Sequence, residues 1–277
     1  MQPDIYEILP VDQLIKPFVR RYLYADVMEE VDTHIRPAPT ACCYVGHIFR
    51  DEAWSVIDGV EGRSGSGFHL CSQVDGRDFK VCYRGRLGHI MAELAPTSMY
   101  RLFRIPASNL LDLATDCFEV LKEGRAEILA AHLSKCSTKE ERLAAFNTAL
   151  EQIVADALAP VKYVDPAVDL IESVEGRITI ADVCDQIGTS ERNLTRLFGN
   201  IVGLTPKFFA RAVQLNSAIQ KLASNDEEKI AALANECGYY DQSHFIKAMQ
   251  QFFQKGPQDF LEGDDHMFHT FIAKSNG

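Results

Sequence analysis

The sequence lacks the features that place a chain in a membrane or outside the cell. It contains no run of eighteen consecutive apolar residues, so we expect no membrane-spanning helix. Its first residues, MQPDIYEILP, hold polar and acidic side chains instead of a basic start before an apolar run, so no signal peptide is expected. The eight cysteines include no C-x-x-C pair, and a reducing compartment would keep them as thiols. These absences predict a cytoplasmic protein.

Positive charge is also scarce, and no metal or phosphate motif is complete. The chain has 28 Lys and Arg against 39 Asp and Glu, a net charge of -11, which argues against a bulk polyanion as partner. The run CCYVGH offers Cys42, Cys43 and His47, but structural zinc needs four ligands, so we favour buried thiols. The glycines of EGRSGSG are not followed by G-K-[ST], which favours a hairpin over a phosphate loop. We therefore predict no metal and no cofactor.

What the chain does contain fits an α+β protein with a domain boundary near residue 160. At 277 residues it exceeds the usual size of one domain. Short apolar runs predict strands over 41–49, 78–87 and 88–95, with a turn-rich connection over 58–69. Four parts are expected: a β-rich domain (1–108), a helical extension and linker (109–160), an all-α domain (161–262) and a C-terminal tail (263–277).

Helical periodicity replaces the strand pattern after the β-rich region. We expect short helices over 110–124 and 126–133, and a longer one over 137–158 that Ser137 and Glu140 begin as a capping box. The apolar residues of the longer helix form one face: Leu143, Phe146, Leu150, Ile153 and Ala157. This face either packs on the β-rich domain, which we favour, or forms a coiled-coil seam between two copies.

Residues 179–198 have the layout of a helix-turn-helix. Thr179 with Asp182 can cap a first helix, Gly188 supplies the turn, and Ser190 caps the second helix. The inward residues recur at helical spacing: Ile180, Val183 and Ile187, then Leu194, Leu197 and Phe198.

The same unit recurs about fifty residues later. Ser224 with Glu227 can cap its first helix, and Gly238 matches the first turn glycine at an offset of fifty. Past the turn the offset is fifty-one, so Asp241 matches the serine cap, which indicates one extra residue in the second turn. Self-similarity at a fixed period indicates that one supersecondary unit is built twice.

Two more helices frame the repeated units. Asp165 and Pro166 predict the start of one helix, which Gly176 ends. Residues 205–223 predict a connecting helix with one apolar face, which spans on the order of 25 Å. That length can hold two recognition helices near the roughly 34 Å that separates successive major grooves on one side of B-DNA. The arrangement predicts a chain that reads two adjacent major grooves.

The second helix of each unit leaves polar or basic side chains on its outward face. Such side chains distinguish base edges in the major groove, because Arg can fork to guanine and Asn to adenine. The predicted DNA-binding residues are Ser190, Arg192, Asn193, Thr195 and Arg196 in the first unit and Gln242, Ser243, His244 and Lys247 in the second. An outward Ile246 would suit thymine methyl groups. A plain solvated surface is the alternative for each face, and the recurrence at matched positions favours DNA.

Local charge partly offsets the acidic total. Residues 160–262 carry ten Lys and Arg against fourteen Asp and Glu, but residues 190–221 carry five bases against Glu191, a local net charge of +4. We expect a small phosphate footprint and a shallow salt dependence, with fewer than about eight counterions released on binding.

These residues resemble the AraC/XylS family of bacterial transcription regulators over about residues 162–262. The run CGYYDQSHFIKAMQQFF is similar to the family's GF-x-D-x-SHF-x-R-x-F core, and GLTP is similar to the G-x-(S/T)-P that opens its linker helix. The resemblance implies that both recognition helices enter the major groove. The residues so implicated are Arg192, Thr195, Arg196, Gln242, Ser243 and Lys247. Lys247 replaces the usual Arg, and QKGPQDFL departs from the family's G-x-T-P-x-x-Y-R ending, so the second unit is expected to contact DNA more weakly.

The N-terminal half resembles the sensor domains that precede such modules, through the run GHIMAELAPTSMYRLFRIP. This implies a β-rich domain for ligand binding or dimerisation. The residues that could line its pocket are Arg36, His47, Trp54, His69, Tyr83 and Tyr100. The expected partner is double-stranded promoter DNA, with RNA polymerase, a small-molecule effector and a second copy of the chain as further candidates, and with no membrane.

Two other classes of protein remain open. An enzyme would use Cys71 as nucleophile, His69 as base and Asp75 or Asp78 to orient it, and such a thiol needs an electropositive setting. An interaction scaffold would bind protein through the paired helices, and its DNA affinity would not change when the outward bases are removed. We favour a transcription regulator that is not an enzyme.

Overall fold

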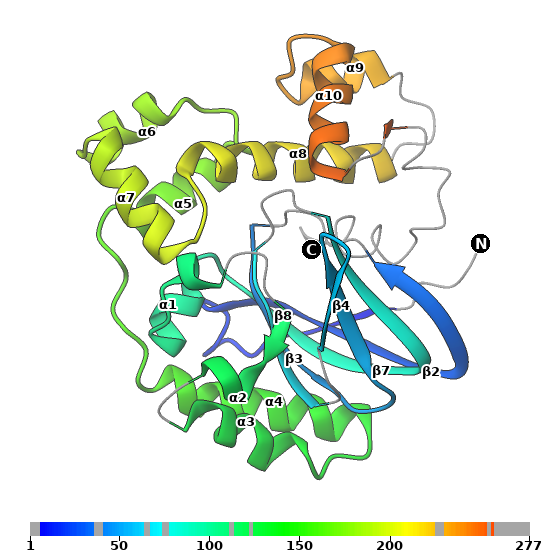
Figure 1. The fold of residues 1–277 in the computed structure, drawn as a ribbon. Helices are drawn as coiled ribbons and strands as arrows, with labels where there is room; N and C mark the ends of the chain where they lie inside the picture. The colour runs from blue at the N-terminus through cyan, green and yellow to red at the C-terminus, as the bar shows by residue number, and fades with distance from the viewer. Residues whose placement is uncertain are drawn as a thin grey trace.

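The computed structural model has a β-sheet part, which lies in the lower half of Figure 1, and a helical part, which lies above it. It describes residues 6–35, 41–63, 67–73, 78–110, 114–121, 124–224, 230–253 and 256–257. A β-rich region comes first along the chain and helices follow, so the predicted α+β class is confirmed. Among the described residues we find no helix with the length and the apolar composition that a membrane crossing needs.

In the described part of the chain, eight strands form one antiparallel sheet. The strands are β1 (Glu7–Leu9), β2 (Val19–Ile35), β3 (Tyr44–Ile48), β4 (Ala53–Ile57), β5 (Val60–Arg63), β6 (Gly67–Cys71), β7 (Phe79–Leu94) and β8 (Ala114–Asp116). The main order is β1-β2-β7-β3-β6-β8, and β4 pairs with both β5 and β7. The long strands β2 and β7, with 17 and 16 residues, pair with each other and form the centre of the sheet.

The two strands predicted over 78–87 and 88–95 are one continuous strand, β7. Its first half pairs with β4 and its second half with β3, while β2 lies along both halves. Gly88, which reads as a break in the sequence, allows a close approach instead, because a Cβ there would overlap Phe49 and Arg50. The strand predicted around β3 is confirmed.

Two predicted stretches differ from the structure. The connection predicted over 58–69 contains β5 and the start of β6, and Asp58 and Gly59, with φ of 51° and 80°, form the two-residue turn of the β4–β5 hairpin. The described part of the helix predicted over 110–124 is strand β8 followed by one helical turn, α2 (Cys117–Val120). Pairing of β8 with β6 outweighs the local helical periodicity.

Helices cover one face of the sheet. They are α1 (Ser98–Phe103), α3 (Arg125–Leu133) and α4 (Lys139–Val154), whereas the 3-10 helix η1 (Ala107–Asn109) lies against the helical part. Phe146 of α4 is fully buried, and its ring stacks on Tyr22 of β2 at 5.4 Å. The predicted packing of this helix on its own sheet is confirmed, and the seam between two copies is contradicted because the apolar face is already covered. The capping box is Thr138 with Glu141, one residue later than predicted.

The opposite face of the sheet carries a second core with two imidazoles inside it. The Nε2 atoms of His69 and His89 are 3.0 Å apart, and the hydroxyl of Tyr6 lies 3.0 Å from His89 Nδ1. Burial lowers the pKa of His69 to about 4 and also lowers the pKa of His89. Both rings are therefore neutral near pH 7.

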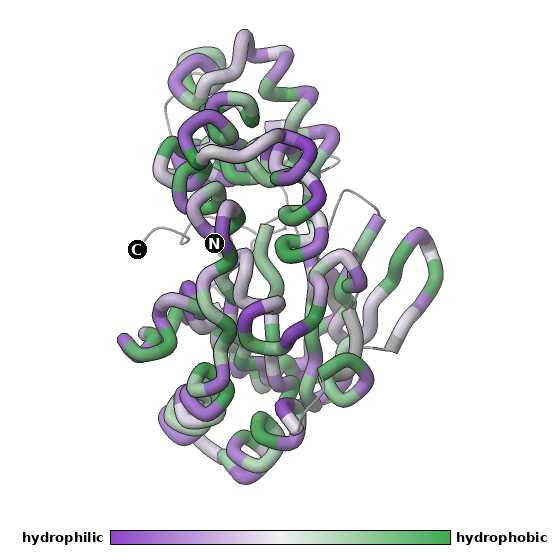
Figure 2. Tube along the Cα trace, turned by 90° about the vertical axis from the view of Figure 1, so that its left-hand side faces the viewer, coloured by the Kyte–Doolittle hydropathy of each residue, from purple (hydrophilic) through white to green (hydrophobic). Residues whose placement is uncertain are grey.

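The helical part is built around one long helix. Its elements are α5 (Val164–Ser173), α6 (Ile180–Ile187), α7 (Glu191–Ile201), α8 (Pro206–Ser224), α9 (Ile230–Glu236) and α10 (Gln242–Phe253). Helices α6 and α7 lie at one end of α8, and α9 and α10 lie at the other (Figure 1). Apolar residues turn inward from each helix, so hydrophobic and hydrophilic segments alternate along the chain in Figure 2. The 19 residues of α8 confirm the predicted connecting helix and span about 28 Å.

The two parts of the molecule contact each other along α5. Asp165 accepts a hydrogen bond from the hydroxyl of Thr97 at 2.8 Å, and Arg20 forms an ion pair with Glu172. Asp165 was predicted to cap α5, but the helix begins earlier, at Val164. One carboxylate oxygen of Asp165 faces the sheet part, and the other accepts the backbone N–H of Val161 just before the helix. The helical part is thus attached to the sheet part through the first of its helices, and also where Ala107 of η1 lies against Gly203, just after α7.

Candidate nucleic-acid interface

The first repeated unit, α6 and α7, is capped as the sequence predicts. Thr179 Oγ1 accepts the N–H of Asp182 at 3.1 Å, and Ser190 Oγ accepts the N–H of Asn193 at 3.3 Å. Gly188 has a φ of 70°, the left-handed conformation that glycine adopts without strain. These contacts fix the angle at which α7 leaves α6.

The second unit, α9 and α10, repeats this construction. Gly238 has a φ of 80°, and Asp241 Oδ1 accepts the N–H of His244 at 2.7 Å. Asp241 therefore caps α10 as Ser190 caps α7. The predicted cap of α9 includes Glu227, which lies outside the described residues.

The outward face of α7 is exposed at its basic residues. Arg192, Thr195 and Arg196 are all exposed. Asn193 is half-buried, and its Nδ2 donates to Thr189 Oγ1 at 3.0 Å while its Oδ1 accepts from Arg196 at 3.2 Å. The Asn193 amide thus orients Arg196, a role that the sequence did not indicate.

The outward face of α10 is exposed at the four residues selected from the sequence. They are Gln242, Ser243, His244 and Lys247. Ile246 between them is half-buried rather than exposed, so it offers less surface to a partner than predicted. The ring of His244 meets Tyr239 edge-on at 5.5 Å, which holds this imidazole beside the turn.

Tyr240 is a further residue of this surface, and the sequence analysis did not select it. It lies in the turn before α10, and 91% of its surface is exposed. Its ring and hydroxyl are available to whatever partner the start of α10 meets. The change of offset from fifty to fifty-one was the signal, because it adds a residue to this turn.

Some of the Lys and Arg side chains that give residues 190–221 their positive charge are bound by other side chains of the helical part. Lys221 Nζ lies 3.1 Å from Glu175 and 3.3 Å from Glu236. Burial acts to lower the pKa of Lys221, but its bonds to the two carboxylates outweigh burial and raise the pKa. Arg211 donates to Gln251 at 2.7 Å. Among the residues that the structure describes, the exposed bases on or next to the recognition helices are Arg192, Arg196, Lys207 and Lys247.

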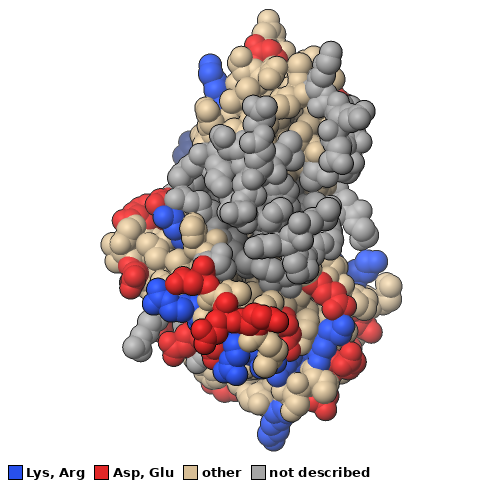
Figure 3. All heavy atoms as spheres, turned by 90° about the vertical axis from the view of Figure 1, so that its right-hand side faces the viewer, with Lys and Arg blue, Asp and Glu red and all other residues tan. Residues whose placement is uncertain are grey.

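The face drawn in Figure 3 is unsuited to a polyanion. Over the sheet part, Asp and Glu side chains gather with single Lys and Arg side chains between them, and the coloured residues form no continuous basic patch.

The other candidate chemistries find little support. Cys42 and Cys43 are buried free thiols, and the described residues include no group of three His, Cys, Asp or Glu that could hold a metal ion. Burial raises the pKa of the Cys71 thiol to about 12, the opposite of what a nucleophile needs. Arg36, Asp75 and the C-terminal tail lie outside the described residues.

Of the residues predicted to line a sensor pocket, the structure brings His69 and Tyr83 together beside His89 and places the others elsewhere. His69 and Tyr83 are buried in the sheet, Tyr100 packs against the core of the helical part, and Trp54 is half-buried. His47 lines a pocket on the helix-covered face of the sheet.

Comparisons with known proteins agree with the geometry of the helical part. Residues 183–263 match a family described as a helix-turn-helix domain. The chain is 31% identical over 83 residues to the HTH-type transcriptional activator RhaS of Escherichia coli, which covers 30% of each chain. It is 24% identical over 111 residues to an uncharacterized HTH-type transcriptional regulator of Haemophilus influenzae, which covers 40% of this chain and 37% of that one. The chain thus spans about a third of the length of these curated relatives.

One solved structure has a similar fold over both parts of the molecule. It is a variant of apo ToxT from Vibrio cholerae, with a TM-score of 0.50 and 13% identity over 87% of this chain and 96% of that chain. At this identity the similarity concerns the fold alone.

Proposed function

The C-terminal region carries an AraC-type helix-turn-helix domain, and from this premise we propose that the chain is a transcription regulator that binds promoter DNA. In the proposal α7 enters one major groove and α10 enters the next. The residues that contact bases or backbone are Arg192, Thr195 and Arg196 on α7, with Gln242, Ser243, His244 and Lys247 on α10. Ser190 caps α7, and Asn193 orients Arg196.

One observation carries this proposal: the same capped helix with an exposed polar face lies at each end of α8. A single solvated helix face would be unremarkable, but Ser190 and Asp241 begin both helices in the same way. The separation that α8 supplies, about 28 Å along its axis, suits the roughly 34 Å between successive grooves on one side of the duplex. We expect α7 to bind more strongly, because it presents Arg192 and Arg196 where α10 presents Lys247.

We assign control of DNA binding to the sheet part, either through a small molecule or through self-association. The contacts of Asp165 and Glu172 with the sheet part support this assignment, because a change in the sheet can reach α5 through them. RNA polymerase and a second copy of the chain are the further partners in this proposal. An interaction scaffold, the competing function, would bind no preferred duplex.

A selection from a random duplex pool tests the proposal. The purified protein is incubated with the pool at moderate salt, and the retained duplexes are sequenced. We expect a motif of two blocks whose centres lie about 10 base pairs apart. Retention of duplexes without a common motif would indicate nonspecific electrostatic binding. Retention of no duplex would favour the interaction scaffold. A single block would refute binding in two grooves.

A further inference from the structure

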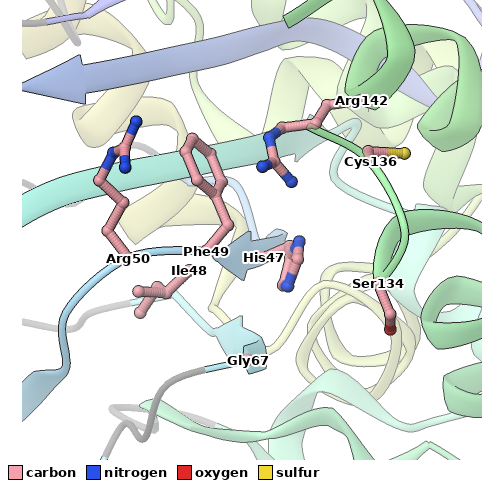
Figure 4. Close-up of a pocket in the computed structure, with 8 residues that line it drawn as sticks. All are labelled: His47, Ile48, Phe49, Arg50, Gly67, Ser134, Cys136 and Arg142. Carbon is pink, nitrogen blue, oxygen red and sulfur yellow. The ribbon is translucent and has the colours of Figure 1, made fainter. Parts of the chain in front are cut away.

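A pocket of about 350 Å³ lies between the helix-covered face of the sheet and the turn before α4. Its lining includes His47 of β3, Phe49 and Arg50 just beyond β3, and Arg142 of α4. Figure 4 shows the side chains of Arg142 and His47 directed toward each other at the centre, whereas the guanidinium of Arg50 is directed away. The inner polar groups of the pocket are therefore one cation and one imidazole.

Arg142 is a buried charge without an acidic partner. Only 8% of its surface is exposed, its Nε is buried without a hydrogen-bond partner, and among the described residues it forms no ion pair. The ring of Phe49 lies 3.8 Å from its guanidinium carbon. This cation–π contact stabilises the charge but leaves the N–H donors unused. Burying such a charge is costly unless an anion approaches it.

The carboxylates nearest to this region are bound by other donors. Asp26 accepts from Arg50 at 3.0 Å and from the hydroxyl of Tyr24 at 3.3 Å. Glu141 accepts two backbone N–H groups of the capping box at 2.8 and 3.2 Å. Both carboxylates interact electrostatically with Arg142, but neither is hydrogen-bonded to it, so the side-chain N–H donors of Arg142 remain open to a ligand.

His47 offers a second unused donor beside Arg142. Its ring stacks on Phe68 at 4.4 Å with the two planes 4° apart, which fixes its orientation. It is 8% exposed, and its buried Nδ1 has no hydrogen-bond partner among the described residues. Burial, together with the charge of Arg142, lowers the pKa of His47 to about 4. The ring is therefore neutral near pH 7 and has one N–H to donate.

We propose that this pocket binds a small organic anion whose carboxylate or phosphate group accepts hydrogen bonds from Arg142 and His47. A planar guanidinium matches either group with two parallel hydrogen bonds. The volume is near the lower end of the roughly 300–1,000 Å³ of known ligand pockets, which favours a compact polar metabolite over a long acyl chain. The bound anion would offset the desolvation of Arg142.

This pocket would be the site through which a small molecule controls DNA binding. That regulatory role rests on the proposed function, whereas anion binding by the pocket does not. The pocket lies on the side of the sheet that α3 and α4 cover, away from α8 (Figure 1). The ligand therefore acts on the sheet part and does not touch DNA. Binding is measured without DNA, so failure of the site and failure of the DNA-binding proposal are distinguishable.

Calorimetric titration with three probes tests the site. The probes are benzoate, its neutral analogue benzamide, and inorganic phosphate, all at constant ionic strength. We expect benzoate, phosphate or both to bind once per chain, and benzamide not to bind. The two anions distinguish a carboxylate ligand from a phosphate ligand. Failure of both anions to bind, or equal binding of benzamide and benzoate, would overturn the proposal.

Two variants assign the binding to this pocket. Arg142→Met removes the guanidinium, and His47→Phe keeps the stack on Phe68 while it removes the N–H. We expect each variant to weaken anion binding about tenfold or more, because each removes a hydrogen bond to a charged group. Lys162→Met, at an exposed position in the segment before α5 and outside the pocket lining, is the control and should bind as the unaltered chain does.

The stability of the variants completes the test. Arg142→Met should not lower the thermal midpoint without anion, because it removes an unpaired buried charge. If this variant does not fold, anion binding by His47→Phe and the nuclear magnetic resonance signal of the Arg142 Nε–H in the unaltered chain test the site instead. That resonance must shift when the anion is added. Full binding in both variants, or an unmoved resonance at saturation, would refute the site.

Discussion

At the scale of single residues, the outward side chains of α7 and α10 belong to a surface and can be replaced without damage to the core. Arg192 is exposed, so Arg192→Ala should leave the thermal midpoint unchanged. It should weaken binding to the selected duplex by about 1 to 3 kcal/mol, the usual effect of losing one base contact. Fluorescence anisotropy measures the affinity. Lys135→Ala removes the same charge outside the recognition helices and is the control. Equal losses of duplex affinity in both variants would mean that only net charge matters and that Arg192 makes no base contact.

Buried imidazoles are the second residue-scale feature, and they make stability depend on pH. Burial lowers the pKa of His47 and His69 to about 4 and also lowers that of His89, from an ordinary value of 6.5. As the pH falls below 6.5, the unfolded chain binds protons before the folded chain does. The stabilisation is therefore complete above pH 6.5 and is lost progressively down to about pH 4, on the order of 3 kcal/mol for each of His47 and His69.

Urea unfolding midpoints measured across that pH range test this sign. We expect the urea midpoint to decrease as the pH decreases from 6.5 to 4. His47→Phe should make this decrease shallower, because it removes one imidazole whose pKa is lowered by folding. A midpoint that rises on acidification would contradict buried neutral rings.

At the scale of helices, each recognition helix begins at one side-chain cap. Asp241→Ala removes the acceptor for the N–H of His244, and we expect the free energy of unfolding to fall by about 1 kcal/mol. Asp241→Ser copies the cap that Ser190 provides in the first unit, so it should retain most of the stability. Urea unfolding measures both variants. Equal stability of the Ala and Ser variants would mean that this cap contributes nothing.

The repeated helices could be predicted because their signals are local. Caps, turn glycines and apolar spacing all act within about ten residues, and Gly188 and Gly238 have the left-handed conformation that the spacing requires. The strands depend on distant partners. β7 continues through Gly88 because Phe49 and Arg50 lie against it, and β8 is a strand because it pairs with β6. No local pattern contains either contact.

The same limit applies to the candidate sites. The sequence selects the exposed side chains of α7 and α10, because helical spacing assigns inward and outward positions. It does not reveal that Asn193 bonds Arg196, or that Lys221 is bound by carboxylates of other helices. The pocket of His47 and Arg142 was equally hidden, because one residue lies on β3 and the other on α4.

At the scale of the whole molecule, acidic charge limits the electrostatic part of DNA binding. The chain has a net charge of -11, and the recognition helices have Arg192, Arg196, Lys207 and Lys247 on or next to them. With one phosphate for each of these bases, the logarithm of the binding constant should fall against the logarithm of salt concentration with a slope of about −4. Anisotropy titrations at several salt concentrations give this slope. A slope that requires more than about eight released counterions would contradict the small footprint.

Binding in two grooves is tested most directly by repeating the duplex selection with two variants, Arg192→Ala and Lys247→Ala. If α7 and α10 read separate grooves, the first variant loses base preference in one block and the second variant loses it in the other. The blocks should stay about 10 base pairs apart in both selections. Loss of preference in the same block for both variants, or unchanged preference in both, would contradict a duplicated reading unit.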